Sequence, residues 1–171
     1  MTEIIKIIKR SGVGVMPTDT IYALVGSALS KKSVLRIYKT RKRDLKKPFI
    51  VLIENIKDLK KFGVKTDERV SKFLKNVWPG PVSIILSVKS KKFFYLHRGT
   101  NSIAFRMPKE LWLKKILRKT GPLVAPSANM AGKPPAQTIQ GAKKYFGEGV
   151  DFYLDGGKIS KQPSLLIDVK R

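Results

Sequence analysis

The sequence contains no cysteine and a single histidine, His97. The first absence excludes disulfide bonds, thiolate nucleophiles and cysteine-ligated zinc. The second excludes a metal site with several histidine ligands. It also leaves His97 as the sole candidate base for a Ser-His-Asp triad, which weakens that hypothesis. Acidic residues are scarce as well, 12 against 36 basic ones, and no pair of carboxylates suited to acid–base catalysis stands out.

Long apolar runs are also missing. The longest, such as residues 82–86, are far shorter than the roughly 20 residues that a membrane-spanning helix needs. The first ten residues follow an amphipathic pattern and contain no cleavage site for secretion. We therefore expect a cytoplasmic protein that does not associate with membranes.

The familiar phosphate-binding and nucleophile motifs are absent. The sequence contains no Gly-x-x-x-x-Gly-Lys-Ser/Thr loop, no Gly-x-Gly-x-x-Gly and no Gly-x-Ser-x-Gly. A function that depends on one of these motifs is excluded.

The chain is long enough, at 171 residues, to form one domain with its own core, and we expect residues 1–171 to be a single domain. The net charge is +24, which attracts nucleic acid, nucleotides or other anionic surfaces. Lysine supplies 27 of the 36 basic residues, so a lysine-rich composition of the source organism explains part of this excess equally well.

Hydrophobic periodicity and turn residues predict an irregular succession of helices and strands. The expected helices cover residues 3–10, 31–40, 56–62, 67–78, 108–119 and 138–146. The expected strands cover residues 13–16, 49–53, 82–88, 93–98, 102–107, 123–126, 152–155 and 165–169. Because several strands follow one another directly, we expect an α/β domain with a mixed sheet.

Residues 37–53 form the most informative stretch. A helical pattern ends there in a strongly basic loop, and Pro48 then forces the chain into an extended strand. A cationic loop between a helix and a buried strand is well placed to hold a polyanion. A solvated basic surface is the alternative interpretation.

Polar side chains gather in three further places. Residues 17–20 (PTDT) and residues 127–129 (SAN) each follow a predicted strand, and Arg106 ends an apolar one. These residues are suited to a polar ligand; the alternatives are capped turns and an arginine that reaches solvent. The inventory of cations, hydroxyls and backbone-exposing turns suits the positioning and charge neutralisation that phosphoryl and nucleotidyl transfer require.

Five blocks in this order resemble a known family: PTDTIYAL, the basic loop with its proline, WPGPVSIIL, IAFRMP, and PLVAPSANMAGKPPAQT with a later DGG and Ser164. Together they resemble the YrdC-type L-threonylcarbamoyladenylate synthase family, over nearly the whole chain. The resemblance implies a twisted mixed sheet with surrounding helices and a large basic concave cavity. It also implies a reaction in which ATP, L-threonine and bicarbonate give L-threonylcarbamoyladenylate and pyrophosphate.

The resemblance assigns roles to individual residues. Asp19 and Tyr22 would shape the threonine pocket. The residues that would bind threonine are Thr20, Ser102, Arg106, Ser127 and Ser164. Those that would bind ATP are Arg41, Arg43, Lys47, Asn129 and Gln137, with Arg41 and Arg43 as the catalytic cations. Mg²⁺ would accompany ATP, without a metal site built from protein side chains.

Three departures from the family pattern bear on activity. The signature Lys-x-Arg, counted back from Pro48, falls on Arg41 and Arg43, so an arginine replaces the lysine; Lys39 and Arg41 form the alternative register. Ala23 and Val25 stand where glycines are usual, and the sequence stops at residue 171, before a late arginine motif that many members use on ATP.

Two other functions remain open at this stage. One is a non-catalytic module that binds tRNA or double-stranded RNA through its charge. The other is a paralogue that uses a different carbamoyl-type substrate. If the synthase interpretation is right, the product serves tRNA modification by a downstream threonylcarbamoyl transferase complex.

Overall fold

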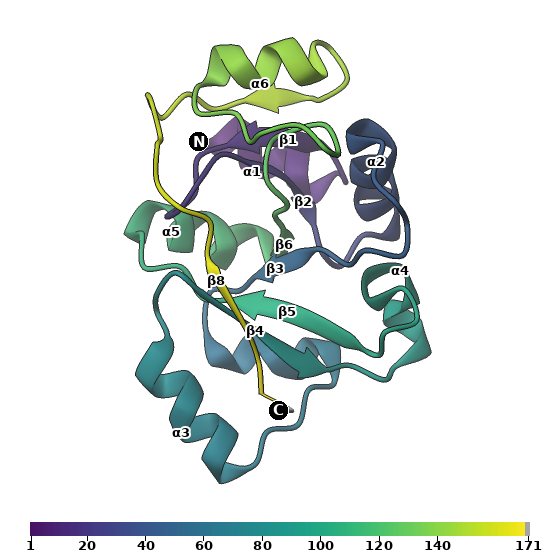
Figure 1. The fold of residues 1–171 in the computed structure, drawn as a ribbon, viewed down its shortest axis with the longest axis vertical. Helices are drawn as coiled ribbons and strands as arrows, with labels where there is room; N and C mark the ends of the chain where they lie inside the picture. Colours follow the sequence, from purple (N-terminus) through teal and green to yellow (C-terminus); the bar gives the residue numbers. More distant parts are fainter. Residues whose placement is uncertain (170–171) are drawn as a thin grey trace.

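The computed structural model describes residues 1–169 and contains one mixed sheet (Figure 1). Its strands are β1 (Val13–Met16), β2 (Ala23–Ser27), β3 (Ile50–Leu52), β4 (Val82–Ser87), β5 (Ser102–Arg106), β6 (Leu123–Val124), β7 (Phe152–Tyr153) and β8 (Leu165–Asp168). Across the sheet their order is β7-β1-β2-β6-β3-β5-β4-β8. The pairs β1–β7, β3–β5 and β4–β8 are parallel and the other neighbours are antiparallel, which confirms the predicted mixed sheet.

Helices surround the sheet. The α-helices are α1 (Thr2–Lys9), α2 (Lys31–Arg41), α3 (Glu68–Val77), α4 (Phe94–His97), α5 (Leu111–Thr120) and α6 (Ile139–Phe146), and the 3₁₀ helices are η1 (Ile56–Phe62) and η2 (Lys91–Phe93). Among the described residues, no helix combines the length and the apolar character needed to cross a bilayer.

The two faces of the sheet bury separate cores because side chains alternate along each strand. Along β2, Ala23 and Val25 face the core formed with α1 and α5, whereas Leu24 faces the larger core on the other side. Gly26 lets α2 approach this strand closely, since a Cβ at this position would lie 3.1 Å from the Cβ of Ser33.

Several predicted helix starts are confirmed, and a side chain caps each of these helices. Asn55 caps η1 through a capping box, and the Thr138 side chain accepts a hydrogen bond from the amide of Gly141 at the start of α6. Asp67 caps α3, with Oδ1 2.7 Å from the amide nitrogen of Val70. These side chains satisfy amide groups that a helix start otherwise leaves unpaired.

Two predictions of local structure are wrong. Residues 93–98 form the end of η2 and helix α4 instead of a strand, and Phe93, Leu96 and His97 are buried at the i, i+3, i+4 spacing of a helix. In addition, the expected strands do not include β2, which begins at Ala23, three residues after the PTDT segment.

The connection between the last two strands spans the whole sheet. β7 and β8 lie at opposite edges, although they follow each other along the chain. Residues 154–164 therefore cross the sheet from one edge to the other, as the yellow segment of Figure 1 shows. We call residues 156–164 the crossing segment.

Candidate active site

The turn after β1 is held together by Thr18. Its hydroxyl donates a hydrogen bond to the carbonyl of Ile21 (2.7 Å) and accepts one from the amide of Thr20 (3.2 Å). Its Oγ1 also lies 3.1 Å from Oγ1 of Thr20. Because both threonines are buried, this network fixes the Thr20 hydroxyl in the interior of the protein.

Four of the predicted threonine-binding residues line a cavity of about 140 Å³. Thr20 comes from the turn after β1, Arg106 from the end of β5, Ser127 from the segment after β6, and Ser164 from the end of the crossing segment. The remaining lining residues are Thr18, Ile21, Ala23, Ile50, Ala125, Pro126, Pro135 and Pro163. The cavity is much smaller than the roughly 300–1,000 Å³ of typical sites for drug-sized ligands.

Arg106 forms a buried ion pair beside this cavity. Its Nη2 lies 3.1 Å from Oδ1 of Asp19, and both side chains are about 5% exposed. Burial raises the pKa of Asp19, and the charge of Arg106 opposes that rise. Lys161 of the crossing segment reaches the same turn, with Nζ 3.3 Å from the carbonyl oxygen of Asp19.

Arg41, at the end of α2, is bonded to the SAN segment. Its Nε donates to the carbonyl of Asn129 (2.9 Å), and its Nη2 donates to Oδ1 of Asn129 (2.9 Å) and to Oγ of Ser127 (3.3 Å). Arg41 is 2% exposed. Burial, together with the nearby charge of Arg43, lowers the pKa of Arg41 to about 10, so it stays charged at neutral pH.

Arg43 and Lys47, the other two predicted ATP-binding cations of the basic loop, are more exposed than Arg41. The guanidinium of Arg43 lies 5.5 Å from the ring centre of Phe49, and its Nε donates to the carbonyl of Lys47 at 3.4 Å. The Tyr38 hydroxyl donates to that same carbonyl at 3.0 Å, which anchors the loop to α2. Neither Arg43 nor Lys47 lines the small cavity.

Ser102 and Gln137 do not line the small cavity either. Ser102 is at the opposite end of β5 from Arg106, roughly 13 Å away at the rise of an extended strand, and its hydroxyl donates to Oγ1 of Thr100. Gln137 is exposed, and its carbonyl accepts a hydrogen bond from the amide of Ile159 in the crossing segment (2.8 Å).

The crossing segment covers the site and is fixed at both ends. Near its start, the Tyr22 hydroxyl accepts a hydrogen bond from the amide of Gly156 and donates one to the carbonyl of Gly157, both at 2.8 Å. At its end, Ser164 Oγ lies 2.9 Å from Oγ of the fully buried Ser83 in β4. The segment therefore carries Ser164 to the cavity from the far edge of the sheet.

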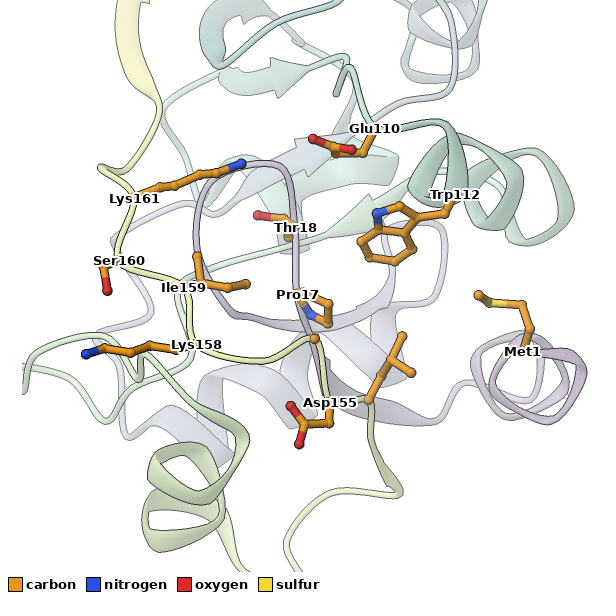
Figure 2. A pocket seen from close by; sticks show the side chains of 12 residues that line it. Met1, Pro17, Thr18, Glu110, Trp112, Asp155, Lys158, Ile159, Ser160 and Lys161 are labelled. Atoms are coloured by element: carbon orange, nitrogen blue, oxygen red, sulfur yellow. The ribbon is translucent and has the colours of Figure 1, made fainter.

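A larger hollow of about 510 Å³ lies next to the same turn. Figure 2 shows Trp112 and Pro17 on its walls and Lys161 extending toward the turn that carries Thr18. Because Thr18 also lines the small cavity, the two spaces are neighbours. A third hollow, of about 590 Å³, is lined by Asp19, Thr20 and residues 161–163, among others.

Sequence analysis assigned no role to Thr18, Lys161 or Ser83. Thr18 belongs to the hydroxyl-rich turn that the sequence does single out. Nothing distinguishes Lys161 from the other lysines, because its contact with Asp19 joins residues 142 positions apart. The same holds for Ser83, whose partner Ser164 is 81 positions away.

The fold and these contacts define a mixed α/β protein with a small cavity, which an arginine and several hydroxyls line together with apolar side chains. Residues 6–171 match the model of the Sua5/YciO/YrdC family, which carries the description "Telomere recombination". The chain therefore belongs to this family, and the resemblance found in its sequence is confirmed.

Relatives with known names agree with this membership. The chain is 31% identical over 153 residues to the threonylcarbamoyl-AMP synthase of Pyrococcus abyssi, an alignment that covers 88% of this chain and 45% of that protein. It is 24% identical over 169 residues to the enzyme of the same name from Stutzerimonas stutzeri, covering 98% and 91%. Both of these relatives are named as synthases of threonylcarbamoyl-AMP.

Solved structures share the fold. P. abyssi Sua5 complexed with L-threonine superposes with a TM-score of 0.91 at 27% identity, covering 99% of this chain and 50% of that one. Escherichia coli YciO superposes with a TM-score of 0.85 at 24% identity, covering 98% and 82%, and its likeness concerns the fold alone. The chain spans about half the length of the P. abyssi protein.

Proposed function

We propose that this chain is an L-threonylcarbamoyladenylate synthase. It would join ATP, L-threonine and bicarbonate into L-threonylcarbamoyladenylate with release of pyrophosphate, which makes it a nucleotidyltransferase. The product would serve threonylcarbamoylation of adenosine in tRNA, carried out in the cytoplasm by a separate transferase complex.

The observation that carries this proposal is the convergence of four side chains on one small cavity. Thr20, Arg106, Ser127 and Ser164 offer hydroxyls and one cation around about 140 Å³. An amino acid presents a carboxylate for the arginine and hydrogen-bonding groups for the hydroxyls. That a relative of known structure is complexed with L-threonine adds support from outside this chain. Ser102 was also expected to bind threonine, and that role stays a prediction.

The chemistry requires two anions to approach each other. The threonine amine reacts with bicarbonate to give N-carboxythreonine, whose carboxylate then attacks the α-phosphorus of ATP while the bond to the β-phosphate oxygen breaks. Arg41 and Arg43 would offset the repulsion between the two reactants and stabilise the charge that develops on pyrophosphate. Arg106 would keep the substrate carboxylate in place during both steps.

The nucleotide would lie on the side of the basic loop and the SAN segment. Arg43, Lys47, Asn129 and Gln137 are the proposed ATP contacts beside Arg41. Magnesium would enter with the nucleotide as MgATP, held by phosphate oxygens and water. Among residues 1–169, no group of three or more histidine, cysteine, aspartate or glutamate side chains is placed to hold a metal ion.

The two alternative functions make different demands on the site. A module that only binds RNA has no need for a small cavity. Of the three residues expected to converge on one pocket in a synthase, Thr20 and Ser127 line this cavity and support the synthase over the RNA-binding module, whereas Asn129 does not line it. A paralogue with another substrate would keep the cavity. Dependence of the reaction on threonine separates the paralogue from the synthase. Direct binding of tRNA or double-stranded RNA does not separate them, because either enzyme could also bind RNA.

The test is mass spectrometry of a reaction with ATP, L-threonine, bicarbonate and Mg²⁺. We expect a product with the mass of threonylcarbamoyl-adenylate that disappears when either threonine or bicarbonate is omitted. Folded protein that binds ATP but yields no such product would favour the paralogue. Protein that binds neither small molecule but does bind RNA would favour the RNA-binding module.

A further inference from the structure

The charges of the buried Asp19–Arg106 pair compensate each other, but several of its polar atoms make no hydrogen bond. The two side chains approach to 3.1 Å, yet both carboxylate oxygens of Asp19 and Nε of Arg106 lack hydrogen-bond partners. Within residues 1–169, these three atoms are the only buried side-chain polar atoms in that condition. Such atoms are costly in a folded protein, and each calls for a specific explanation.

The pair stands between two open spaces. Arg106 and Thr20 line the small cavity, while Asp19 and Thr20 border the hollow of about 590 Å³. Pro163 of the crossing segment borders both. Arg106 therefore lies in the wall of the proposed substrate site, and Asp19 lies directly behind it, at the border of the neighbouring hollow.

The unsatisfied atoms complement the two ends of an amino acid. They consist of one N–H donor on Arg106 and two acceptor oxygens on Asp19. An amino acid at neutral pH brings a carboxylate that accepts hydrogen bonds and an ammonium group that donates them. We propose that the substrate carboxylate binds Arg106 in place of Asp19, and that Asp19 then binds the substrate ammonium group and accepts its proton. This inference rests on the proposed function.

A proton acceptor is required because only a neutral amine can attack carbon. The ammonium group transfers one proton to Asp19, and the freed lone pair forms a bond to the carbon of bicarbonate. The C–O bond to the bicarbonate hydroxyl breaks, and this hydroxyl leaves as water with a second proton from the nitrogen. The product is the carbamate, and Asp19 later returns its proton to solvent.

The surroundings of Asp19 favour this role. Burial raises the pKa of Asp19, and the neighbouring Glu110 adds to that rise. Arg106 on β5, the backbone amide of Asp19 itself and Lys161 on the crossing segment act in the opposite direction, although the geometry of that amide falls short of a hydrogen bond to either carboxylate oxygen. When the substrate carboxylate neutralises Arg106, the charge that most strongly lowers the pKa of Asp19 is lost, which favours proton uptake; the substrate ammonium group acts against this effect until its proton has been transferred.

The experiment compares wild-type protein with Asp19→Asn, which keeps the shape of the side chain but cannot take up a proton. At pH 7, product formation by this variant should fall by about a hundredfold or more. At about pH 9, where more of the free threonine carries a neutral amine, the deficit should shrink to less than about tenfold. Asp67→Asn is the matched control, because asparagine also caps a helix and the residue lies at the start of α3.

Two results would overturn the proposal. One is a variant as active as wild type at pH 7. The other is a variant equally impaired at both pH values, which would show that Asp19 only supports the structure around Arg106. Asp19→Glu, which restores a carboxylate, should recover the pH dependence of the wild type.

A binding measurement on wild-type protein keeps the proposal testable if Asp19→Asn does not fold. By calorimetry, 2,3-dihydroxybutanoate, in which a hydroxyl replaces the ammonium group of threonine, should bind at least about tenfold more weakly than L-threonine. Equal binding of the two compounds would refute the contact with Asp19. This comparison needs no turnover, so it also separates a failure of this inference from a failure of the proposed synthase reaction.

Discussion

Arg41 and Asn129 are joined by two hydrogen bonds, from Nε to the main-chain carbonyl and from Nη2 to Oδ1, each 2.9 Å long. The main chain repeats the link, because the amide of Ala131 donates to the carbonyl of Arg41 at 2.9 Å. Arg41, which the resemblance in sequence aligns with the signature lysine of the family, therefore stabilises the SAN segment. A lysine at this position could supply the charge but not the planar fork that makes both contacts.

These contacts predict that Arg41 contributes to stability as well as to the proposed chemistry. Arg41→Ala should lower the free energy of unfolding by about 3 kcal/mol, because it removes three hydrogen bonds of a buried cation and leaves their acceptors unpaired. Arg41→Lys should cost only about 1 kcal/mol. Urea denaturation measures both, and equal stability of wild type and Arg41→Ala would contradict the structural role.

Arg43 should matter for activity and little for folding. Its side chain makes one long hydrogen bond and a cation–π contact with Phe49, so Arg43→Ala should change the free energy of unfolding by less than about 1 kcal/mol. ATP-dependent product formation should fall by about a hundredfold or more, as expected when a cation on a transferring phosphate group is lost. The control is Lys46→Ala, an exposed lysine of the same loop, which should retain activity. Full activity of Arg43→Ala would reject the phosphate role.

Ser83 and Ser164 offer a matched pair of variants. Their hydroxyls are 2.9 Å apart, but only Ser164 lines the small cavity. Ser83→Ala and Ser164→Ala should each cost about 1 kcal/mol of stability, since either one breaks the same hydrogen bond. Only Ser164→Ala should also raise the KM for threonine, by about threefold to tenfold. A similar rise in both variants would mean that the effect comes from the crossing segment and not from the hydroxyl in the cavity.

Asp151 predicts a specific dependence of stability on pH. Burial raises its pKa, but this is outweighed by hydrogen bonds from Arg36 and from the amide of Val13, so the pKa of Asp151 lies below its ordinary value of 3.8. A depressed carboxyl pKa stabilises the fold above the ordinary pKa, and this contribution is lost as pH falls through the lower, folded-state pKa.

Asp151→Asn should therefore be less stable than wild type at pH 7, by about 1 kcal/mol, given that both members of the ion pair are about one-third exposed. The difference should shrink as the pH falls below about 3.8. Guanidinium chloride unfolding at a series of pH values measures it. A difference that is the same at every pH would assign the effect to packing.

Most of the elements could be predicted from the sequence because their signals are local. Three helix starts depend only on residues a few positions away, because a neighbouring side chain caps each helix: Asn55, Asp67 and Thr138. The two failures come from stretches in which local signals conflict. The aromatic residues of 93–98 favour a strand by propensity, yet burial of Phe93 and Leu96 follows a helix, and tertiary packing decides between the two.

The candidate site also contains features with a local signal in the sequence and features without one. The polar blocks around Thr20, Ser127 and Arg106 are visible in the sequence, and their convergence on one cavity is consistent with that interpretation. The pairing of Asp19 with Arg106 could not be predicted, because a lone arginine at the end of a strand has many possible partners. Their contact depends on how the turn after β1 meets the end of β5, which only the assembled sheet determines.

The crossing segment also has a consequence for the order of events during synthesis. β8 pairs with β4, whose residues precede it by 83 positions, and seven strands of the sheet leave the ribosome before β8 does. Contacts between residues so distant along the chain form late, because a long loop must close before they can stabilise anything. We therefore expect a nascent chain to have most of its sheet before Ser164 is made, so that the small cavity is completed only when nearly the whole of the described chain has been synthesised.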